Sequence, residues 1–323
     1  MLPNGRRLGA HLPLGNGMVK AADRAAEIGA SALQIFSDNP TSWRRRPEPP
    51  RELPAFRARL AGHGIAPLAI HAPYLVNLAG PDADEVFGRS VDILVNELRV
   101  AHAYGATFLN IHMGSHRGAG VPSGIARLAD GMARVVETVA DDAPDVRLIL
   151  ENGAGGGFGI GVTLEELAAI DAAVAGRGVD RERYGFCLDT AHLWGAGYAI
   201  GTPDGVDGLL ADFGRLIGIE RLRMVHLNDS RAELGSHPDR HEHIGAGRIG
   251  GAGLARMATH PDLDHVAYFL ETPGMEEGWD AVNLARAWDM AAGRAVAELP
   301  PEAFATRPAQ SAAPPDAAET AAS

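Results

Sequence analysis

Acidic and histidine side chains close a series of short apolar segments in this chain. The segments end on His11, His71, His112, Glu151, Asp189 and Glu271, and one more carries His226 just before its end at Asp229. Burying a charged or imidazole group at such a position is unfavourable unless something binds it. Because His, Asp and Glu are common ligands of divalent cations, their repetition predicts a shared metal cluster.

Short local motifs add further ligands to this set. Asp189 and His192 lie three residues apart, and Asp239 and His241 lie two apart, so in an extended segment the latter pair points to one side. With His11 set aside, nine candidate ligands result: His71, His112, Glu151, Asp189, His192, His226, Asp239, His241 and Glu271. One ion needs about four ligands, so we expect two or three ions. Zinc fits a histidine-rich site best, with manganese or iron as alternatives.

The spacing of the apolar segments indicates how these ligands would meet. The segments cover residues 8–11, 32–36, 68–71, 108–112, 147–151, 184–189, 223–229 and 266–271. Such short apolar runs are typical of strands buried on both faces of a parallel sheet. Helical patterns lie between them, over residues 20–28, 84–104, 123–140, 163–175, 207–217 and 279–299. This alternation predicts an α/β fold, a (β/α)8 TIM barrel whose strand ends share one face; an open doubly wound sheet is the alternative.

Composition narrows the class of protein. The 323 residues include 29 Lys and Arg against 41 Asp and Glu, a formal net charge of −12, and 46% are hydrophobic, which excludes a wholly disordered or fibrous chain. No apolar run reaches the roughly 18 residues of a membrane helix, and the first residues make a poor signal peptide. We therefore expect a cytoplasmic protein without membrane association. The single cysteine, Cys187, excludes an intramolecular disulfide.

The last residues differ in composition from the rest. Residues 301–323 are rich in Pro, Ala, Ser and Thr and have no periodic apolar face. Such a segment buries too little apolar surface to order itself, which predicts a disordered tail. The barrel would then occupy residues 1–300.

Longer motifs around the candidate ligands resemble those of endonuclease IV, the zinc-dependent apurinic/apyrimidinic endonucleases of base-excision DNA repair. The resemblance runs from Leu8 to Trp288 and is carried, in order, by GAHLPLGNG, IHAPYLVNLA, LNIHMGSH, LILENGAG, FCLDTAHLWGAGY, VHLNDS, PDRHEHIGAGRIG and LETPG. It implies a xylose-isomerase-like barrel with a cluster of three zinc ions. All nine ligand positions of the family carry the expected residue type in this sequence.

The resemblance also implies which residues hold each ion. The three ligand groups would be His71, His112 and Glu151; Glu151, Asp189, His226 and Glu271; and His192, Asp239 and His241. Glu151 would bridge two ions, and Glu151, Asp189 and Glu271 would be the catalytic carboxylates. Asn152, Asn228 and Asp229 are candidates for orienting these ligands from behind.

The implied reaction is hydrolysis of the phosphodiester bond 5′ to an abasic site in double-stranded DNA. The products would be a 3′-hydroxyl and a 5′-deoxyribose phosphate, and the protein would act as a monomer. Tyr74 and Leu75 match residues that enter the minor groove beside the flipped nucleotide. Arg44 and Arg45 would contact phosphates. Thr41 stands where well-studied members carry an arginine, so the resemblance does not imply a second inserting side chain there.

Two other functions use part of the same pattern. A metal-dependent sugar isomerase or epimerase on a related barrel needs only four ligands around one metal, which Glu151, Asp189, His226 and Glu271 would supply. The other five candidate ligands would then have no role. A non-catalytic DNA- or metal-binding barrel would bind metal without turnover. A count of bound metal near three per chain favours the endonuclease, and a count near one favours the isomerase.

Overall fold

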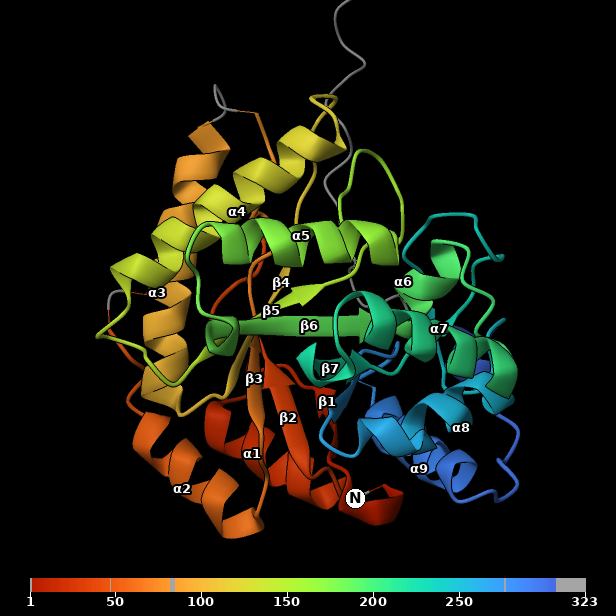
Figure 1. The fold of residues 1–323 in the computed structure, drawn as a ribbon. Helices are drawn as coiled ribbons and strands as arrows, with labels where there is room; N and C mark the ends of the chain where they lie inside the picture. The colour runs from red at the N-terminus through yellow and green to blue at the C-terminus, as the bar shows by residue number, and fades with distance from the viewer. Residues whose placement is uncertain (1, 47, 82–84, 276, 306–323) are drawn as a thin grey trace, which may run out of the picture.

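Eight parallel strands close into a barrel in the computed structural model of the chain, which describes residues 2–46, 48–81, 85–275 and 277–305. The barrel strands are β1 (Leu8–His11), β2 (Ala32–Ile35), β3 (Leu68–His71), β4 (Phe108–His112), β5 (Arg147–Glu151), β6 (Tyr184–Asp189), β7 (Leu222–His226) and β10 (Ala267–Leu270). Parallel pairing of β1 with β10, with Leu8 opposite Tyr268, closes the ring. The predicted (β/α)8 barrel is therefore confirmed, and the open sheet is excluded (Figure 1).

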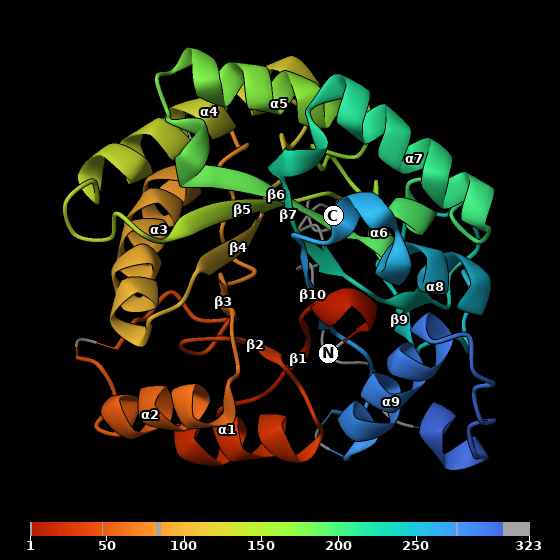
Figure 2. The same cartoon turned by 60° about the horizontal axis from the view of Figure 1, so that its bottom comes forward.

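Helices surround the strands on the outside of the barrel (Figure 2). They are α1 (Met18–Glu27), α2 (Leu53–His63), α3 (Glu85–Tyr104), α4 (Val121–Thr138), α5 (Leu164–Gly176), α6 (Thr190–Gly195), α7 (Pro203–Leu216), α8 (Gly251–Thr259) and α9 (Trp279–Ala291). Short 3-10 helices are η1 (Pro3–Gly5), η2 (Arg181–Arg183), η3 (Ile219–Arg221), η4 (Pro261–Leu263) and η5 (Pro301–Ala305). No helix in the described ranges is long and apolar enough to cross a membrane.

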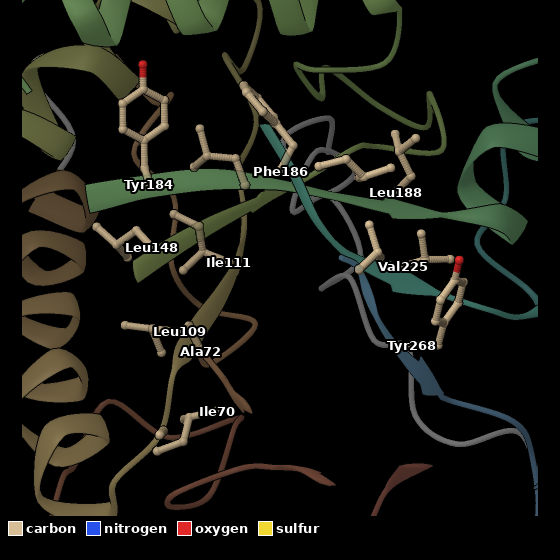
Figure 3. Packing of buried hydrophobic residues seen from close by; sticks show 14 of the residues in the cluster. Ile70, Ala72, Leu109, Ile111, Leu148, Tyr184, Phe186, Leu188, Val225 and Tyr268 are labelled. Carbon is tan, nitrogen blue, oxygen red and sulfur yellow. The ribbon is translucent and has the colours of Figure 1, made fainter. Parts of the chain in front are cut away.

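Side-chain alternation along the strands separates two apolar regions. The outward residues pack under the helices, as Figure 3 shows for Tyr184 and Phe186 on β6. The inward residues fill the barrel with a second cluster: Ala32, Ala69, Phe108, Ile149, Cys187, Met224, Ala267 and Phe269. A residue two positions after an inward residue also points inward. Polar residues at the strand ends therefore face the mouth of the barrel.

Several elements differ from the sequence-based expectation. Helices α2 and α8 were not predicted, because each carries only a few buried apolar residues, such as Phe56 in α2 and Met257 in α8. Helix α9 ends at Ala291 rather than at residue 299. The expected strand over residues 223–229 is divided: β7 ends at His226, and β8 (Asp229–Ser230) pairs antiparallel with β9 (His241–Glu242).

Helix α5 begins with a capping box, formed by Thr163 and the residue three positions later, Glu166. The Thr163 side chain accepts a hydrogen bond from the backbone N–H of Glu166 at 3.2 Å. The carboxylate of Glu166 accepts one from Val162 at 3.0 Å. Two otherwise unpaired backbone donors at the helix start are thereby satisfied.

Ordered chain extends past the expected boundary at residue 300. The 3-10 helix η5 covers Pro301–Ala305, within the segment predicted to be a disordered tail. Its Ala303 is buried, and the carbonyl oxygen of Ala303 accepts a hydrogen bond from Nε2 of buried His243 at 2.9 Å. These contacts hold the first residues of the predicted tail against the barrel domain. Residues 306–323 lie outside the described residues.

Truncating the barrel interior is expected to destabilise the protein. Phe269 is fully buried inside the ring, so Phe269→Ala should lower the free energy of unfolding by about 3–5 kcal/mol in urea denaturation. Phe158→Ala is the matched control, because Phe158 is 52% exposed and its loss should change the value by less than about 0.5 kcal/mol. Equal effects of the two substitutions would contradict the assignment of Phe269 to the core.

Candidate metal centre

The nine candidate ligands meet at the carboxyl-terminal mouth of the barrel. His71, His112, Glu151, Asp189 and His226 are the last residues of β3 to β7. Strand register aligns neighbouring ends, with His112 opposite Glu151 and Asp189 opposite His226. Three groups result, each with ligand atoms within 4.8 Å of one another: His71, His112 and Glu151; Glu151, Asp189, His226 and Glu271; and Asp189, His192 and His241.

Glu151 belongs to two of these groups and directs one carboxylate oxygen at each. Its Oε2 lies 3.6 Å from Nε2 of His71 and 3.5 Å from Nε2 of His112. Its Oε1 lies 3.1 Å from Nδ1 of His226, which is also 3.3 Å from Oε2 of Glu271. This division of the two oxygens is the geometry that a bridging carboxylate requires. The side chain of His112 is 42% exposed, so the first group opens to solvent.

The third group combines two local structures. Asp189 caps helix α6, accepting the backbone N–H of His192 at 2.9 Å, and this cap places both side chains on the same side of the mouth. The β8–β9 hairpin brings in Asp239 and His241. Asp239 Oδ2 lies 3.2 Å from Nε2 of His192, and Oδ1 lies 3.1 Å from Nε2 of His241. Asp189 also reaches His241, at 3.5 Å, so it joins the second and third groups.

Backbone carbonyl groups set the orientation of three imidazoles. Nδ1 of His71 donates to the Ala72 carbonyl at 2.7 Å, and Nδ1 of His192 donates to the Asn152 carbonyl at 2.9 Å. Nδ1 of His241 donates to the Glu271 carbonyl at 2.8 Å. In each ring Nε2 is left facing the neighbouring carboxylates, which is the orientation that a metal ligand needs.

Buried amide side chains orient the remaining ligands. Gln34 accepts a hydrogen bond from Nε2 of His226 at 3.0 Å and donates to Oε1 of Glu271 at 2.6 Å. Asn110 donates to Oε2 of Glu151 at 2.5 Å. Sequence reasoning missed both amides, although each is a lone polar residue inside an apolar strand, two positions from an inward-facing apolar side chain. That pattern is the signal that could have found them.

Of the three orienting candidates drawn from the sequence, two lie against the ligands. Asn228 donates to Oδ2 of Asp189 at 2.7 Å, and Oδ1 of Asn152 accepts the backbone N–H of Asp189 at 2.7 Å. Asp229 has a different role, and its prediction was wrong. Its carboxylate accepts backbone N–H groups from Ser230 and from the loop before α8, at Gly247, Ile249 and Gly250. Asp229 therefore shapes that loop rather than a ligand.

Charge in the centre is arranged to favour cations. Burial raises the pKa of the Glu151 carboxyl, but the imidazoles of His226 and His112 outweigh burial and hold this pKa well below its ordinary value. Burial lowers the pKa of His241, but Asp239 and Asp189 outweigh it and raise the pKa to about 10. Nε2 of His241 is buried and faces the carboxylates of Asp239 at 3.1 Å and Asp189 at 3.5 Å. These side chains, buried and turned toward one another, fit divalent cations of the zinc type.

The residues expected to contact DNA differ in their accessibility to solvent. Tyr74 and Leu75 are half-buried on the rim, and the Tyr74 ring lies 5.8 Å from that of His71. Arg44 is exposed. Arg45, the other residue expected to contact phosphate, is much less accessible: its side chain is only 10% exposed, and its guanidinium donates to the Ser42 carbonyl at 2.6 Å. Arg45 holds its own loop.

Comparison with known proteins places the chain in two steps. Residues 22–292 match the family described as xylose isomerase-like TIM barrels, which is the class that the fold defines. A probable endonuclease 4 from Methanoculleus marisnigri is 40% identical over 285 residues, covering 88% of this chain and 98% of the relative. The crystal structure of endonuclease IV from Thermus thermophilus matches with a TM-score of 0.76 at 36% identity, covering 89% of this chain and 99% of that one. The chain therefore belongs to the endonuclease IV family.

A more distant likeness concerns the fold alone. A D-tagatose 3-epimerase-like protein matches with a TM-score of 0.62 at 17% identity, covering 86% of this chain and 94% of that one. Sugar epimerases thus share the barrel architecture of this protein. Their similarity carries no information about its substrate.

Metal binding to the metal-free protein is expected to release protons at neutral pH. The raised pKa values of His192 and His241 keep both rings protonated there, and Nε2 must lose its proton before it can bind a cation. Zinc affinity should therefore increase with pH until the rings are neutral, near pH 10 for His241. Calorimetric titration in two buffers of different ionisation enthalpy measures this release. Identical heats in both buffers would count against the assignment.

Proposed function

We propose that the protein hydrolyses the phosphodiester bond 5′ to abasic sites in double-stranded DNA, using three zinc ions and leaving a 3′-hydroxyl and a 5′-deoxyribose phosphate. One observation carries this proposal: three ligand groups are joined into one cluster because Glu151 and Asp189 each belong to two of them. Membership of the endonuclease IV family supports the same reaction.

The nine side chains would hold the ions at the mouth of the barrel. His71, His112 and Glu151 would hold the first ion, and Glu151, Asp189, His226 and Glu271 the second. His192, Asp239 and His241 would hold the third, with Asp189 in reach of it. Bound divalent cations supply electrostatic stabilisation of the phosphate and activation of water near neutral pH. Manganese or iron would be possible substitutes for zinc.

The protein's own contribution is to keep these donors fixed in place. Gln34, Asn110 and Asn228 each hold a ligand side chain by a hydrogen bond of 2.7 Å or less. A protein nucleophile is not required. Cys187 is buried inside the barrel, and burial raises the pKa of its thiol to about 12, so it stays uncharged at neutral pH.

DNA would approach the rim beside the first ligand group. The exposure of His112 marks the open side of the centre, and the Tyr74 ring, with Leu75 next in the chain, lies 6.2 Å from that of His112. In this proposal Tyr74 and Leu75 replace base stacking beside the abasic nucleotide, and Arg44 contacts phosphate. The net charge of −12 opposes DNA binding at long range, and the bound cations offset it locally. The proposal includes a monomer acting in the cytoplasm.

A sugar isomerase or epimerase would use the second ligand group alone. Glu151, Asp189, His226 and Glu271 do form a four-ligand group. That function leaves the first and third groups unexplained. Imidazoles in both groups are nevertheless oriented by hydrogen bonds to backbone carbonyl groups. A metal-dependent epimerase activity with one bound ion per chain would favour it over the endonuclease.

The direct test combines metal analysis with a nicking assay. Protein stripped by a chelator should not cut a duplex that contains one abasic site, and addition of zinc should restore cutting 5′ to that site. Elemental analysis of the restored protein should give about three zinc ions per chain, the number of ligand groups. If zinc-loaded protein never nicks this duplex, the proposed function is wrong.

Replacement of the bridging carboxylate separates catalysis from folding. Glu151→Gln removes the charge shared by two ligand groups, so nicking should fall by at least about a thousand-fold and bound zinc by at least one ion. The circular dichroism spectrum should be unchanged, because Glu151 ends its strand rather than filling the core. Glu165→Gln, on the exposed surface of α5, is the control and should keep full activity. Wild-type turnover by Glu151→Gln would contradict the cluster.

A further inference from the structure

The loop after β2 contacts both the metal centre and the rim. This second rim loop, residues 36–46, begins at Phe36, whose ring lies 5.2 Å from that of His71 and 5.3 Å from that of Tyr74. Further along, the Pro40 carbonyl accepts the backbone N–H of Tyr74 at 3.2 Å. The conformation of the loop therefore bears directly on the residues that would meet DNA.

A single buried carboxylate holds both ends of this loop. Glu97 of helix α3 is 1% exposed, which is unusual for a glutamate. Its Oε2 accepts a hydrogen bond from the Ser37 hydroxyl at 2.5 Å, and its Oε1 lies 3.4 Å from Nε of Arg45. Ser37 and Arg45 stand near opposite ends of the loop. Glu97 thus joins two points that are well separated along the loop.

Arg45 also forms hydrogen bonds with the middle of the loop. Its Nη1 donates to the Asn39 carbonyl at 3.1 Å and its Nη2 to the Ser42 carbonyl at 2.6 Å. Two backbone carbonyl groups of the loop therefore depend on one guanidinium. Removing either charge would leave its partner buried without compensation.

Packing beneath the loop is incomplete. A cavity of about 190 Å³ lies between the loop and α3, lined among others by Asp38, Arg46, Pro49, Asn96 and Tyr104. Unfilled space provides no dispersion contacts, so apolar packing is weak on this side of the loop. Trp43 of the same loop packs against the hydrophobic core, and the guanidinium of Arg89 in α3 lies 5.8 Å from the centre of its ring. The polar contacts of Glu97 connect the part of the loop that lies over the cavity to α3, in addition to the contact made by Trp43.

The free energy of a buried ion pair suggests that Glu97 and Arg45 do more than stabilise the fold. A buried ion pair adds little net stability compared with apolar residues of the same size, because desolvation offsets the attraction. Such pairs can instead select one conformation. A loop already in its binding conformation loses less entropy when it binds.

We propose that Glu97 is a positioning residue that holds the second rim loop, through Ser37 and Arg45, in the conformation that engages abasic DNA. This inference rests on the proposed function. Glu97 belongs to none of the three ligand groups, so its effect should fall on DNA binding rather than on the chemical step. It gives Arg45, which is not available for phosphate, a defined role.

The test compares Glu97→Gln with wild-type zinc-loaded protein on an abasic duplex. We expect KM to rise about ten-fold, as for loss of one charge-assisted contact, with kcat changed by less than about two-fold and zinc content unchanged. Arg45→Gln should give the same rise, and the double variant should be no worse than either single one. Asp92→Asn, at an exposed position of α3, is the matched control and should leave KM unchanged.

Limited trypsin digestion provides a readout that does not depend on activity. Both variants should be cut after Arg44 faster than wild type, because the freed loop opens to the protease. Unchanged KM and unchanged cutting in both variants would overturn the inference, as would additive effects in the double variant. Should Glu97→Gln fail to fold, Arg45→Gln decides the outcome. Absence of nicking by the wild-type protein would refute the proposed function. The digestion would still test whether Glu97 and Arg45 hold the second rim loop.

Discussion

Electrostatic repulsion among carboxylates at the barrel mouth is the constraint on which the rest of the structure depends. Glu151, Asp189, Asp239 and Glu271 lie close together, and Glu151 and Asp189 are buried. Like charges in such a site are stable only beside positive charge, supplied by protons on the imidazoles or by cations. The interleaved histidines and carboxylates meet this need in the metal-free protein. Bound zinc would meet it without the protons.

The barrel satisfies this constraint with rigid supports. Ligands on strand ends are held by the sheet, and amides from the strands or the residues after them, such as Gln34, Asn110 and Asn228, occupy places that apolar side chains would otherwise fill. Each amide makes less hydrophobic contact than an apolar side chain would, but its hydrogen bond fixes the orientation of a ligand. The rim loops lack this support, and a buried carboxylate from α3 contacts the second rim loop instead. The ligand positions are therefore set by the strands, whereas the loops that would meet DNA in the proposed function are held by contacts of their own.

Much of the fold and most of the candidate site could be predicted from local patterns. Apolar runs with a polar final residue marked the barrel strands, and side-chain alternation alone turned His71, Glu151 and Asp189 toward the same space. Helix α2 and the β8–β9 hairpin were missed because their stability comes from packing against the barrel rather than from their own periodicity. The burial of Arg45 against Glu97 was not predicted, because Glu97 is remote in the chain and this contact cannot be seen in the local sequence.

By itself the sequence determined which residue types stand at the strand ends, and hence that a metal-binding barrel was expected. That expectation follows from apolar strand patterns and from ligand chemistry, which are local, whereas phosphodiester cleavage was implied by the resemblance to endonuclease IV. Only the tertiary structure decided which oxygen of Glu151 faces which histidine, that Asp189 serves two groups, and that Asp229 shapes a loop. Barrel closure sets these choices, because the shear of the strands fixes distances between residues remote in the chain.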